Sequence, residues 1–229
     1  MLNLKYYTII KIYLIKIIFF LNKNNFLNYI LRNHKKSKSQ VFQDLFVLYY
    51  STKKKRGSFV EIGGGNGVDI SNTYLLEKKY RWKGIICEPN QNLQKQIKLR
   101  RSSKLIKLPI THKCSKNFKF YEHLDPYQSS TIKKKNVVNI IQTGSMCLNH
   151  LLKKNMSKKI IDYISIDTEG NELDILRKFN FKKFKVKIFT IEHNFNEDKR
   201  WNIFLIMKKN NYKRVFKYLS YMDDWYIKL

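Results

Sequence analysis

The chain has 229 residues, of which 43% are hydrophobic and 14% aromatic. This composition excludes a disordered protein and suffices for one α/β domain with a sizeable core. The net charge of +29 comes from 46 basic and 17 acidic residues and would suit a polyanionic partner. However, lysines spread along a chain rich in Lys, Asn and Ile are also what an AT-rich coding sequence produces. The charge is therefore weak evidence for nucleic-acid binding.

The first 38 residues differ in composition from the rest, with eight basic residues and no acidic one. The apolar run at 6–21 is interrupted by Lys11 and Lys16, so it is too short for a membrane span. It also lacks the small-residue cleavage site of a signal peptide. Two interpretations stay open: an anchor whose lysines reach an anionic membrane surface, or a helix packed on the domain or on a partner subunit. We expect a cytoplasmic protein, attached peripherally to the inner face of a membrane under the first interpretation.

A single domain is expected over residues 39–229, after a basic linker at 34–39. It begins with a helix at 39–48 and then alternates strand and helix. Strands are predicted at 58–62, 84–87, 104–108, 163–166 and 186–191, and helices at 71–80, 90–101, 145–154, 172–179 and 199–209. Extra strands at 117–121 and 137–141 flank a polar loop, and a pair at 212–218 and 225–227 ends the chain. This order predicts a Rossmann-like α/β fold: a mostly parallel seven-stranded sheet, helices on both faces and an antiparallel C-terminal strand pair.

Three cysteines occur, Cys87, Cys114 and Cys147, far apart and without a CxxC pair. An odd number at such spacing predicts neither a disulfide framework nor a zinc site. A reducing compartment is the natural expectation.

A glycine-rich turn follows the first strand, with the pattern acid-x-Gly-x-Gly-x-Gly. This differs from the dinucleotide pattern, and its leading carboxylate suits a cationic group such as the amino end of S-adenosylmethionine better than a pyrophosphate. Glycines are needed where the chain turns tightly and a ligand approaches the backbone. We expect cofactor contacts from Glu61, Gly63, Gly65, Asn66 and Gly67.

Glu88 ends the second strand, 21 residues after Gly67. A carboxylate there can accept hydrogen bonds from both ribose hydroxyls of a nucleoside cofactor. The alternative is an ordinary surface glutamate at a strand end. The presence of Glu61 upstream makes this alternative weaker.

Two acidic residues follow the fourth core strand, in Asp167-Thr168-Glu169-Gly170. The carboxyl ends of parallel strands meet at one edge of the sheet, where ligands collect. Asp167 is expected to touch the cofactor amine or to orient the substrate, and Glu169 to face the same rim. The alternative is that Thr168 or Glu169 caps the next helix.

His193 follows the fifth core strand and is the preferred candidate for the general base, because an imidazole titrates near neutral pH. A structural histidine that bridges loops is the alternative. A cation site made by Asp167 with Glu192 or Asn194 has no tight spacing to support it, so no metal is predicted. Asp125-Pro126-Tyr127 is interpreted as a turn.

Together these runs resemble the FkbM family of S-adenosylmethionine-dependent methyltransferases over about residues 39–228. The most similar stretches are Ser39–Leu48, Phe59–Gly63, Ser71–Tyr74, Trp82–Gly84 with Glu88–Asn90, Tyr163–Gly170, Ile191–Phe195, Asn211–Val215 and Asp224–Tyr226. The resemblance implies a class I methyltransferase fold, S-adenosylmethionine as cofactor, and methyl transfer to oxygen in sugars, glycolipids or natural products. Two departures are Glu61, where the family often has Asp, and Leu108–Ile110, in which no adenine contact is assigned.

The predicted function is thus an O-methyltransferase acting on a hydroxyl of a sugar, a glycan or glycolipid, or a related metabolite. Asp167 or Glu169 would orient His193 or replace it as base. An RNA methyltransferase is the first alternative, but neither the Lys-Asp-Lys-Glu set nor an Asp-Pro-Pro-aromatic motif is present, so a nucleic-acid partner is not expected. The second alternative is a non-catalytic binding module. The sequence gives no signal for the oligomeric state.

Overall fold

The computed structural model describes residues 10–16, 25–156 and 160–229. Within these ranges, seven strands form one sheet in the order β3-β2-β1-β7-β8-β10-β9. The first five in this order are parallel, whereas β10 runs antiparallel to both β8 and β9. The predicted fold class is therefore confirmed. The strands are β1 (Ser58–Ile62), β2 (Lys83–Cys87), β3 (Lys104–Ile106), β7 (Ile160–Ile166), β8 (Lys185–Glu192), β9 (Tyr212–Val215) and β10 (Asp223–Lys228).

The strand order of the sheet reverses between β1 and β7, which pair directly. From β1 the chain builds outward through β2 and β3, and it then returns to add β7 and β8 on the other side. Open α/β sheets bind ligands outside the carboxyl ends of the strands at such a point. The register places Ile62 beside Cys87 of β2 and beside Ile166 of β7. The residues that follow these three strands therefore meet at one edge.

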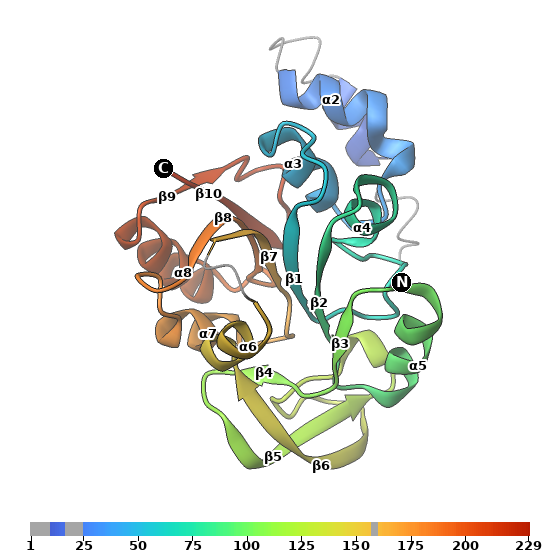
Figure 1. Ribbon diagram of the computed structural model, residues 1–229, viewed down its shortest axis with the longest axis vertical. Coiled ribbons are helices and arrows are strands. Elements are labelled where there is room, and N and C mark those ends of the chain that lie inside the picture. The colour runs from blue at the N-terminus through green and yellow to red at the C-terminus, as the bar shows by residue number, and fades with distance from the viewer. Residues whose placement is uncertain (1–9, 17–24, 157–159) are drawn as a thin grey trace.

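Helices cover both faces of the sheet (Figure 1). On one face, apolar residues of α6 (Leu148–Asn155), α7 (Glu172–Lys178) and α8 (Glu197–Lys209) form a core with the strands. On the other, α3 (Gln43–Tyr50), α4 (Tyr74–Tyr80) and α5 (Gln91–Arg100) form a second core. Side chains alternate between the two faces along a strand, so Val60 and Ile62 join the first core and Phe59 joins the second.

A second, smaller sheet stands at the carboxyl edge of the main sheet (Figure 1). It has the order β4-β6-β5, with β4 (Ile110–Thr111), β5 (Ser115–His123) and β6 (Val137–Cys147). The segment between β5 and β6 contains a short 3-10 turn, η2 (Pro126–Gln128), in which the side chain of Asp125 accepts a hydrogen bond from Tyr127 N at 3.1 Å. The two long strands exceed the predicted 117–121 and 137–141, because much of their length is exposed and shows little hydrophobic alternation.

Several predicted boundaries were wrong. The helix expected at 39–48 is Gln43–Tyr50, and the strand expected at 104–108 ends at Ile106. Three further boundaries differ for local reasons. The helix expected from residue 71 begins at Tyr74, since residues 71–73 bind a buried carboxylate. The helix expected from 145 begins at Leu148, since β6 continues to Cys147. The strand expected over 212–218 ends at Val215, and Phe216 has a φ of 53° that breaks the strand.

Part of the N-terminal region packs against α3. Residues 10–16 are helical, and α2 (Asn25–Asn33) is followed by η1 (His34–Lys36). Ile15, Phe26, Leu27 and Ile30 are buried in the same core as α3. Of the apolar run at 6–21, residues 6–9 and 17–21 lie outside the described ranges. Among the described helices, none combines the length and the apolar character needed to cross a membrane.

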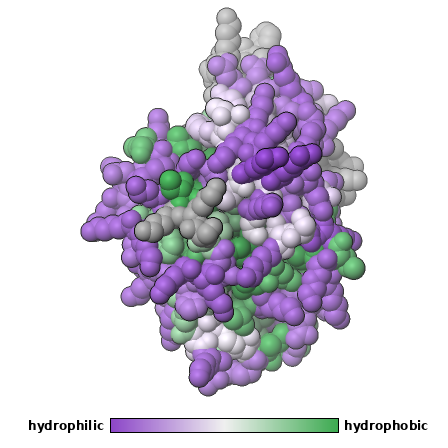
Figure 2. Space-filling view, viewed as in Figure 1, coloured by the Kyte–Doolittle hydropathy of each residue, from purple (hydrophilic) through white to green (hydrophobic). Residues whose placement is uncertain are grey.

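Hydrophilic residues cover most of the face shown in Figure 2, and hydrophobic ones are visible mainly across its middle. The lysines follow the whole chain instead of gathering on one element. The charge therefore forms a general positive surface.

Candidate active site

A cavity of about 970 Å³ opens at the carboxyl edge of the main sheet. Its walls come from the ends of β1, β2, β7 and β8, from Phe120 of β5, and from the loop between β5 and β6. This volume is at the upper end of the range for small-molecule sites. Five of the predicted site residues line it: Gly63, Gly65, Glu88, Asp167 and Glu169.

The glycine turn forms the floor between β1 and β7. Gly63 has a φ of +85°, and a Cβ at this position would lie 1.7 Å from the carbonyl oxygen of Asp167. Gly65 has a φ of +52°, and a Cβ there would meet the Tyr127 ring at 2.7 Å. A side chain is thus excluded at Gly63 by backbone, and at Gly65 by a ring that faces the cavity.

Glu88 lies directly after β2 and is 5% exposed. Its two oxygens accept hydrogen bonds from Gly65 N at 3.0 Å and from Asn90 N at 2.8 Å. Burial raises the pKa of Glu88 to about 8, although the two backbone donors act in the opposite direction. The carboxyl group is thereby held in a fixed orientation at the cavity wall and keeps unused lone pairs.

Glu61 does not line the cavity. Its carboxylate is buried behind the glycine turn, where it accepts hydrogen bonds from Ser71 Oγ, Asn72 N and Thr73 Oγ1 at 3.0, 2.7 and 2.6 Å. Arg101 Nη1 lies 3.6 Å away. Burial raises the pKa of Glu61, and the positive charge of Arg101 opposes that shift.

Asn66 and Gly67 also lie behind the cavity wall. The side chain of Asn66 accepts hydrogen bonds from Val68 N at 2.9 Å and Asp69 N at 2.8 Å, which fixes the turn. Gly67 accepts a hydrogen bond from Arg101 Nη1 at 2.8 Å through its carbonyl oxygen. These two residues and Glu61 therefore shape the turn from behind and do not face the space where a ligand fits.

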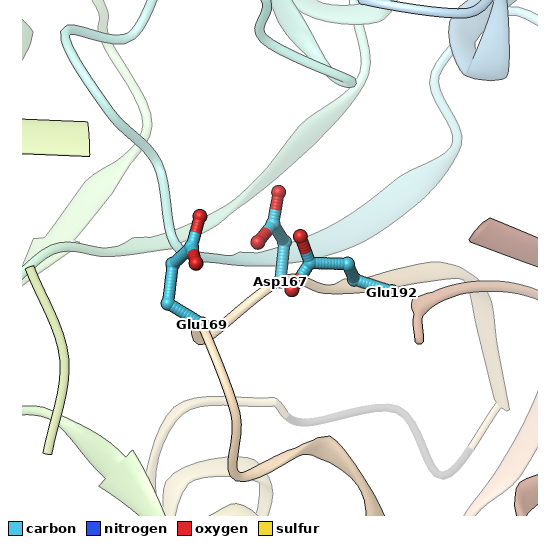
Figure 3. Close-up of side chains that lie close together, drawn as sticks. All are labelled: Asp167, Glu169 and Glu192. Carbon is cyan, nitrogen blue, oxygen red and sulfur yellow. The ribbon is translucent and has the colours of Figure 1, made fainter. Parts of the chain in front are cut away.

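Three carboxylates meet where β7 and β8 end. Figure 3 shows Asp167, Glu169 and Glu192 with their carboxylates directed toward one another. Oxygens of the three lie within 4.8 Å of each other, and all three residues line the cavity. Burial, reinforced by the neighbouring negative charges, raises the pKa of Glu192 to about 11 and that of Asp167 well above its usual value.

Glu169 does not cap the following helix. Its carboxylate pairs with Lys134 Nζ from the loop between β5 and β6, and its own φ is +60°. Thr168 instead contributes to the start of α7, since its hydroxyl donates to Glu172 Oε1 at 2.9 Å and accepts from Asn171 N at 3.2 Å.

His193 is 1% exposed and is absent from the cavity wall. Its Nδ1 accepts a hydrogen bond from Phe195 N at 3.1 Å, and its backbone N donates to Met222 O at 2.8 Å. Burial lowers the pKa of the imidazole. The buried Nε2 of the ring has no hydrogen-bond partner among the described residues.

Sequence reasoning missed several lining residues. Tyr127, Thr131 and Lys134 come from the polar loop between β5 and β6, which carries no recognisable motif. Asn72 also lines the cavity: its Nδ2 donates to Ser165 Oγ at 2.9 Å, while its buried Oδ1 has no hydrogen-bond partner among the described residues. Residues 71–74 belong to the predicted helix start, and only their proximity to the acidic Glu61 could have suggested another role.

The site fits S-adenosylmethionine. The Gly63 position is a cradle that a single Cβ would fill, Glu88 presents a buried carboxylate suited to a ribose, and the orphaned Asn72 Oδ1 can accept from an amino group. Fold and site together define a class I methyltransferase that uses this cofactor.

A family model described as "Methyltransferase FkbM domain" matches residues 61–224. The match spans most of the chain, and the protein belongs to this family. The resemblance inferred from the sequence is therefore confirmed. No curated protein matches the chain.

Several solved methyltransferase structures are similar to the chain at low identity. The METTL16 MTase domain shows 12% identity and a TM-score of 0.47, over 80% of this chain and 63% of that chain. The precorrin-6y C5,15-methyltransferase of Geobacter metallireducens GS-15 shows 9% identity and a TM-score of 0.44, over 75% and 72%. A human methyltransferase 10 domain containing protein shows 12% identity and a TM-score of 0.45, over 81% of this chain and 80% of that chain.

Proposed function

We propose that this protein transfers a methyl group from S-adenosylmethionine to a hydroxyl oxygen of a sugar, a glycan or glycolipid, or a related metabolite. The observation that carries the proposal is the geometry of the cavity. A cofactor-binding end around Glu88 and a wall rich in carboxylates share one space at the sheet edge. A polyhydroxylated acceptor needs many such hydrogen-bond acceptors.

The cofactor would be held by three parts of the chain. Glu88 would accept from the ribose hydroxyls, the backbone around Gly63 and Gly65 would allow close approach, and Asn72 Oδ1 would accept from the amino group. The cofactor supplies a methyl group that its sulfonium already activates. Glu61 then has a positioning role, because its carboxylate holds residues 71–73 in place.

The acceptor hydroxyl is a poor nucleophile unless a base removes its proton. Asp167 and Glu169 line the cavity, whereas His193 does not. We therefore assign proton removal to one of these two carboxylates and not to His193. Lys134, which pairs with Glu169 and lines the same wall, would favour an acceptor with an anionic substituent.

Calorimetric binding of S-adenosylmethionine and of its demethylated product to the full chain tests the cofactor site. We expect binding that Glu88→Ala abolishes and that Glu197→Ala, which changes a glutamate with a 77% exposed side chain, leaves intact. Absence of binding to folded protein would contradict the methyltransferase function.

An acceptor screen with a labelled methyl donor tests the rest of the proposal. Glycans, glycolipids and small sugars are expected to take up label. His193→Ala should stay active, whereas Asp167→Asn or Glu169→Gln, whichever removes the base, should be impaired about 10²- to 10⁴-fold, the usual contribution of a general base. Labelling confined to RNA, with salt-sensitive RNA binding, would overturn the proposed substrate class.

A further inference from the structure

The proposed function gives a role to Asp167 or Glu169 as base, but it does not explain why three carboxylates, those of Asp167, Glu169 and Glu192, lie together. Their oxygens lie within 4.8 Å of each other, and the three side chains converge from the ends of two neighbouring strands (Figure 3). Like charges at this separation repel one another, and burial makes the repulsion stronger. A cation bound between the three carboxylates would relieve this repulsion.

Glu192 provides the second, independent observation. This residue is 3% exposed and lines the cavity, yet its Oε2 has no hydrogen-bond partner among the residues that the structure describes. A buried carboxylate oxygen without a partner is rare, because its desolvation is not compensated. Figure 3 shows this carboxylate facing Asp167 across the cluster.

Two lysines lie near the cluster, and each pairs with a single carboxylate. Lys134 pairs with Glu169 alone, at the outer side of the cluster. Lys199 pairs with Glu172 at 2.9 Å, and Glu172 also accepts from Thr168 N and Gly170 N. Within the described residues, neither lysine forms an ion pair with Asp167 or Glu192.

We propose that Asp167, Glu169 and Glu192 bind one divalent cation, of the Mg²⁺ or Mn²⁺ type, in the cavity. Carboxylate oxygens completed by water are the ligands that these hard ions prefer, and the cluster offers neither sulfur nor imidazole. The inference rests on the proposed function for its purpose: a hydroxyl bound to the ion would lose its proton more readily.

The amino group of the cofactor is the other cation that could satisfy these carboxylates. It has a different acceptor in Asn72 Oδ1, beside the glycine turn. The two sources can be separated, because a metal ion binds in the absence of the cofactor.

The test is a Mn²⁺ titration of the full chain after treatment with EDTA and dialysis, with free Mn²⁺ followed by electron paramagnetic resonance. We expect saturable binding of one Mn²⁺ per chain, weakened at least tenfold by Glu192→Gln and by Asp167→Asn. Glu197→Gln, at an exposed acid, serves as the matched control and should bind as the unaltered protein does. The net charge of +29 repels cations from the general surface, so a saturable site should stand out.

Thermal unfolding gives a second readout that separates binding from misfolding. Without metal, Glu192→Gln should melt no lower than the unaltered protein, because the amide has nearly the same shape as the carboxyl group and cannot repel its acidic neighbours. Added Mn²⁺ should raise the melting temperature of the unaltered chain and of Glu197→Gln, but not that of Glu192→Gln.

The proposal is overturned if folded protein shows no saturable Mn²⁺ binding, or if Glu192→Gln binds as tightly as the unaltered chain. Loss of S-adenosylmethionine binding in Glu192→Gln, with no Mn²⁺ bound by the unaltered chain, would also overturn it and assign the cluster to the amino group. Since the titration contains neither cofactor nor acceptor, its result does not depend on whether methyl transfer is found.

Discussion

Glu88 shows how a single buried carboxyl group can connect cofactor binding to pH. Burial raises its pKa to about 8 from the ordinary value of 4.5, so the group is mostly protonated at neutral pH in the free protein. A ribose donates two hydroxyl protons, and accepting both favours the ionised form. Binding is therefore coupled to the loss of a proton from Glu88.

We predict that affinity for the demethylated cofactor rises as pH increases toward about 8 and then levels off. The slope should be at most about tenfold per pH unit, the limit for one proton. Calorimetry at pH 7 in buffers of different ionisation enthalpy should detect proton release. Glu88→Gln should bind weakly and without this component; a pH-independent affinity in the unaltered protein would contradict the prediction.

The same group predicts the opposite trend for stability. Between pH 4.5 and about 8 the native state binds more protons at Glu88 than the unfolded state does. The free energy of unfolding should therefore fall as pH rises through this window, and this contribution should vanish in Glu88→Gln.

Two glycines in one turn should respond differently to alanine. At Gly63 the new Cβ would meet a backbone oxygen at 1.7 Å, at a φ of +85°, so the strand end itself must move. We expect a loss of stability larger than the about 1–2 kcal/mol of left-handed strain alone. At Gly65 the obstacle is the Tyr127 ring, a side chain that can rotate.

Gly65→Ala should therefore fold and lose mainly cofactor affinity. Denaturant unfolding of both variants, with calorimetric cofactor binding for those that fold, checks the pair. Equal stability of the two variants would show that the backbone contact at Gly63 is not decisive.

At the scale of elements, Arg101 holds the cofactor side of the sheet together. Its side chain is completely buried and donates to Glu77 at 3.1 Å, to Gly67 O at 2.8 Å, and to Ser71 and Thr73 at 3.1 and 2.8 Å. These contacts join the end of α5, the start of α4 and the glycine turn. Arg101 Nη1 also lies 3.6 Å from Glu61 Oε2, the one ion pair that Glu61 makes within the described residues.

We predict that Arg101→Met lowers the free energy of unfolding by about 3–5 kcal/mol, because it leaves a buried carboxylate without its partner. Arg101→Lys should rescue little, since an ammonium cannot reproduce the planar fork. Arg100→Met, at the exposed neighbouring arginine, is the matched control. The deficit of Arg101→Met should shrink at acid pH, where Glu61 is protonated; a constant deficit from pH 4 to 8 would argue against this account.

The main sheet was predictable because its central strands are continuous apolar runs that end in glycine or acid. Those ends gave Gly63, Glu88 and Asp167, which do line the cavity. The inward direction of Glu61 was harder to foresee. It lies two residues after Phe59 and therefore points to the same face of the sheet, toward the core with α3, α4 and α5. Arg101, directly after α5, lies beside it there.

The smaller sheet was less predictable because its paired strands, β5 and β6, are separated by a loop and are largely exposed. Pairing of Ser115 with Ser145 brings Cys114 and Cys147, 33 residues apart, to a separation of 2.9 Å between their sulfurs. The same pairing places Tyr127 and Lys134 on the cavity wall. No periodicity in residues 115–147 reveals this register. A strand that buries little surface has no strong hydrophobic pattern, so its sequence specifies the pairing register only weakly.

At the scale of the whole molecule, the N-terminal region and the catalytic end are joined through one aromatic core. The Phe26 ring is 4.4 Å from the ring of Phe216, 5.0 Å from Tyr49 and 6.2 Å from both Phe46 and Trp225. Trp225 belongs to β10, which pairs with β8 through Thr190. Gln43 of α3 donates to Asp223 at 2.7 Å, in the same strand. Residues before position 39 thus support the strand that flanks the acidic cluster.

Removal of this support should be felt across the sheet. We predict that Phe26→Ala lowers the free energy of unfolding by about 3–5 kcal/mol, the cost of emptying a packed aromatic site, whereas Arg32→Ala at an exposed position of α2 changes it little.

A chain limited to residues 39–229 would expose the α3 face, so the emission of Trp225, fully buried in the intact protein, should shift toward that of a solvated indole. If the shortened chain instead kept the emission and the melting temperature of the full one, the N-terminal region would be an appendage, and its apolar side chains would be free to serve a membrane or a partner. The packing of Phe26 against four aromatic rings favours the first outcome, because a surface anchor that must leave the domain would forfeit those contacts each time it bound.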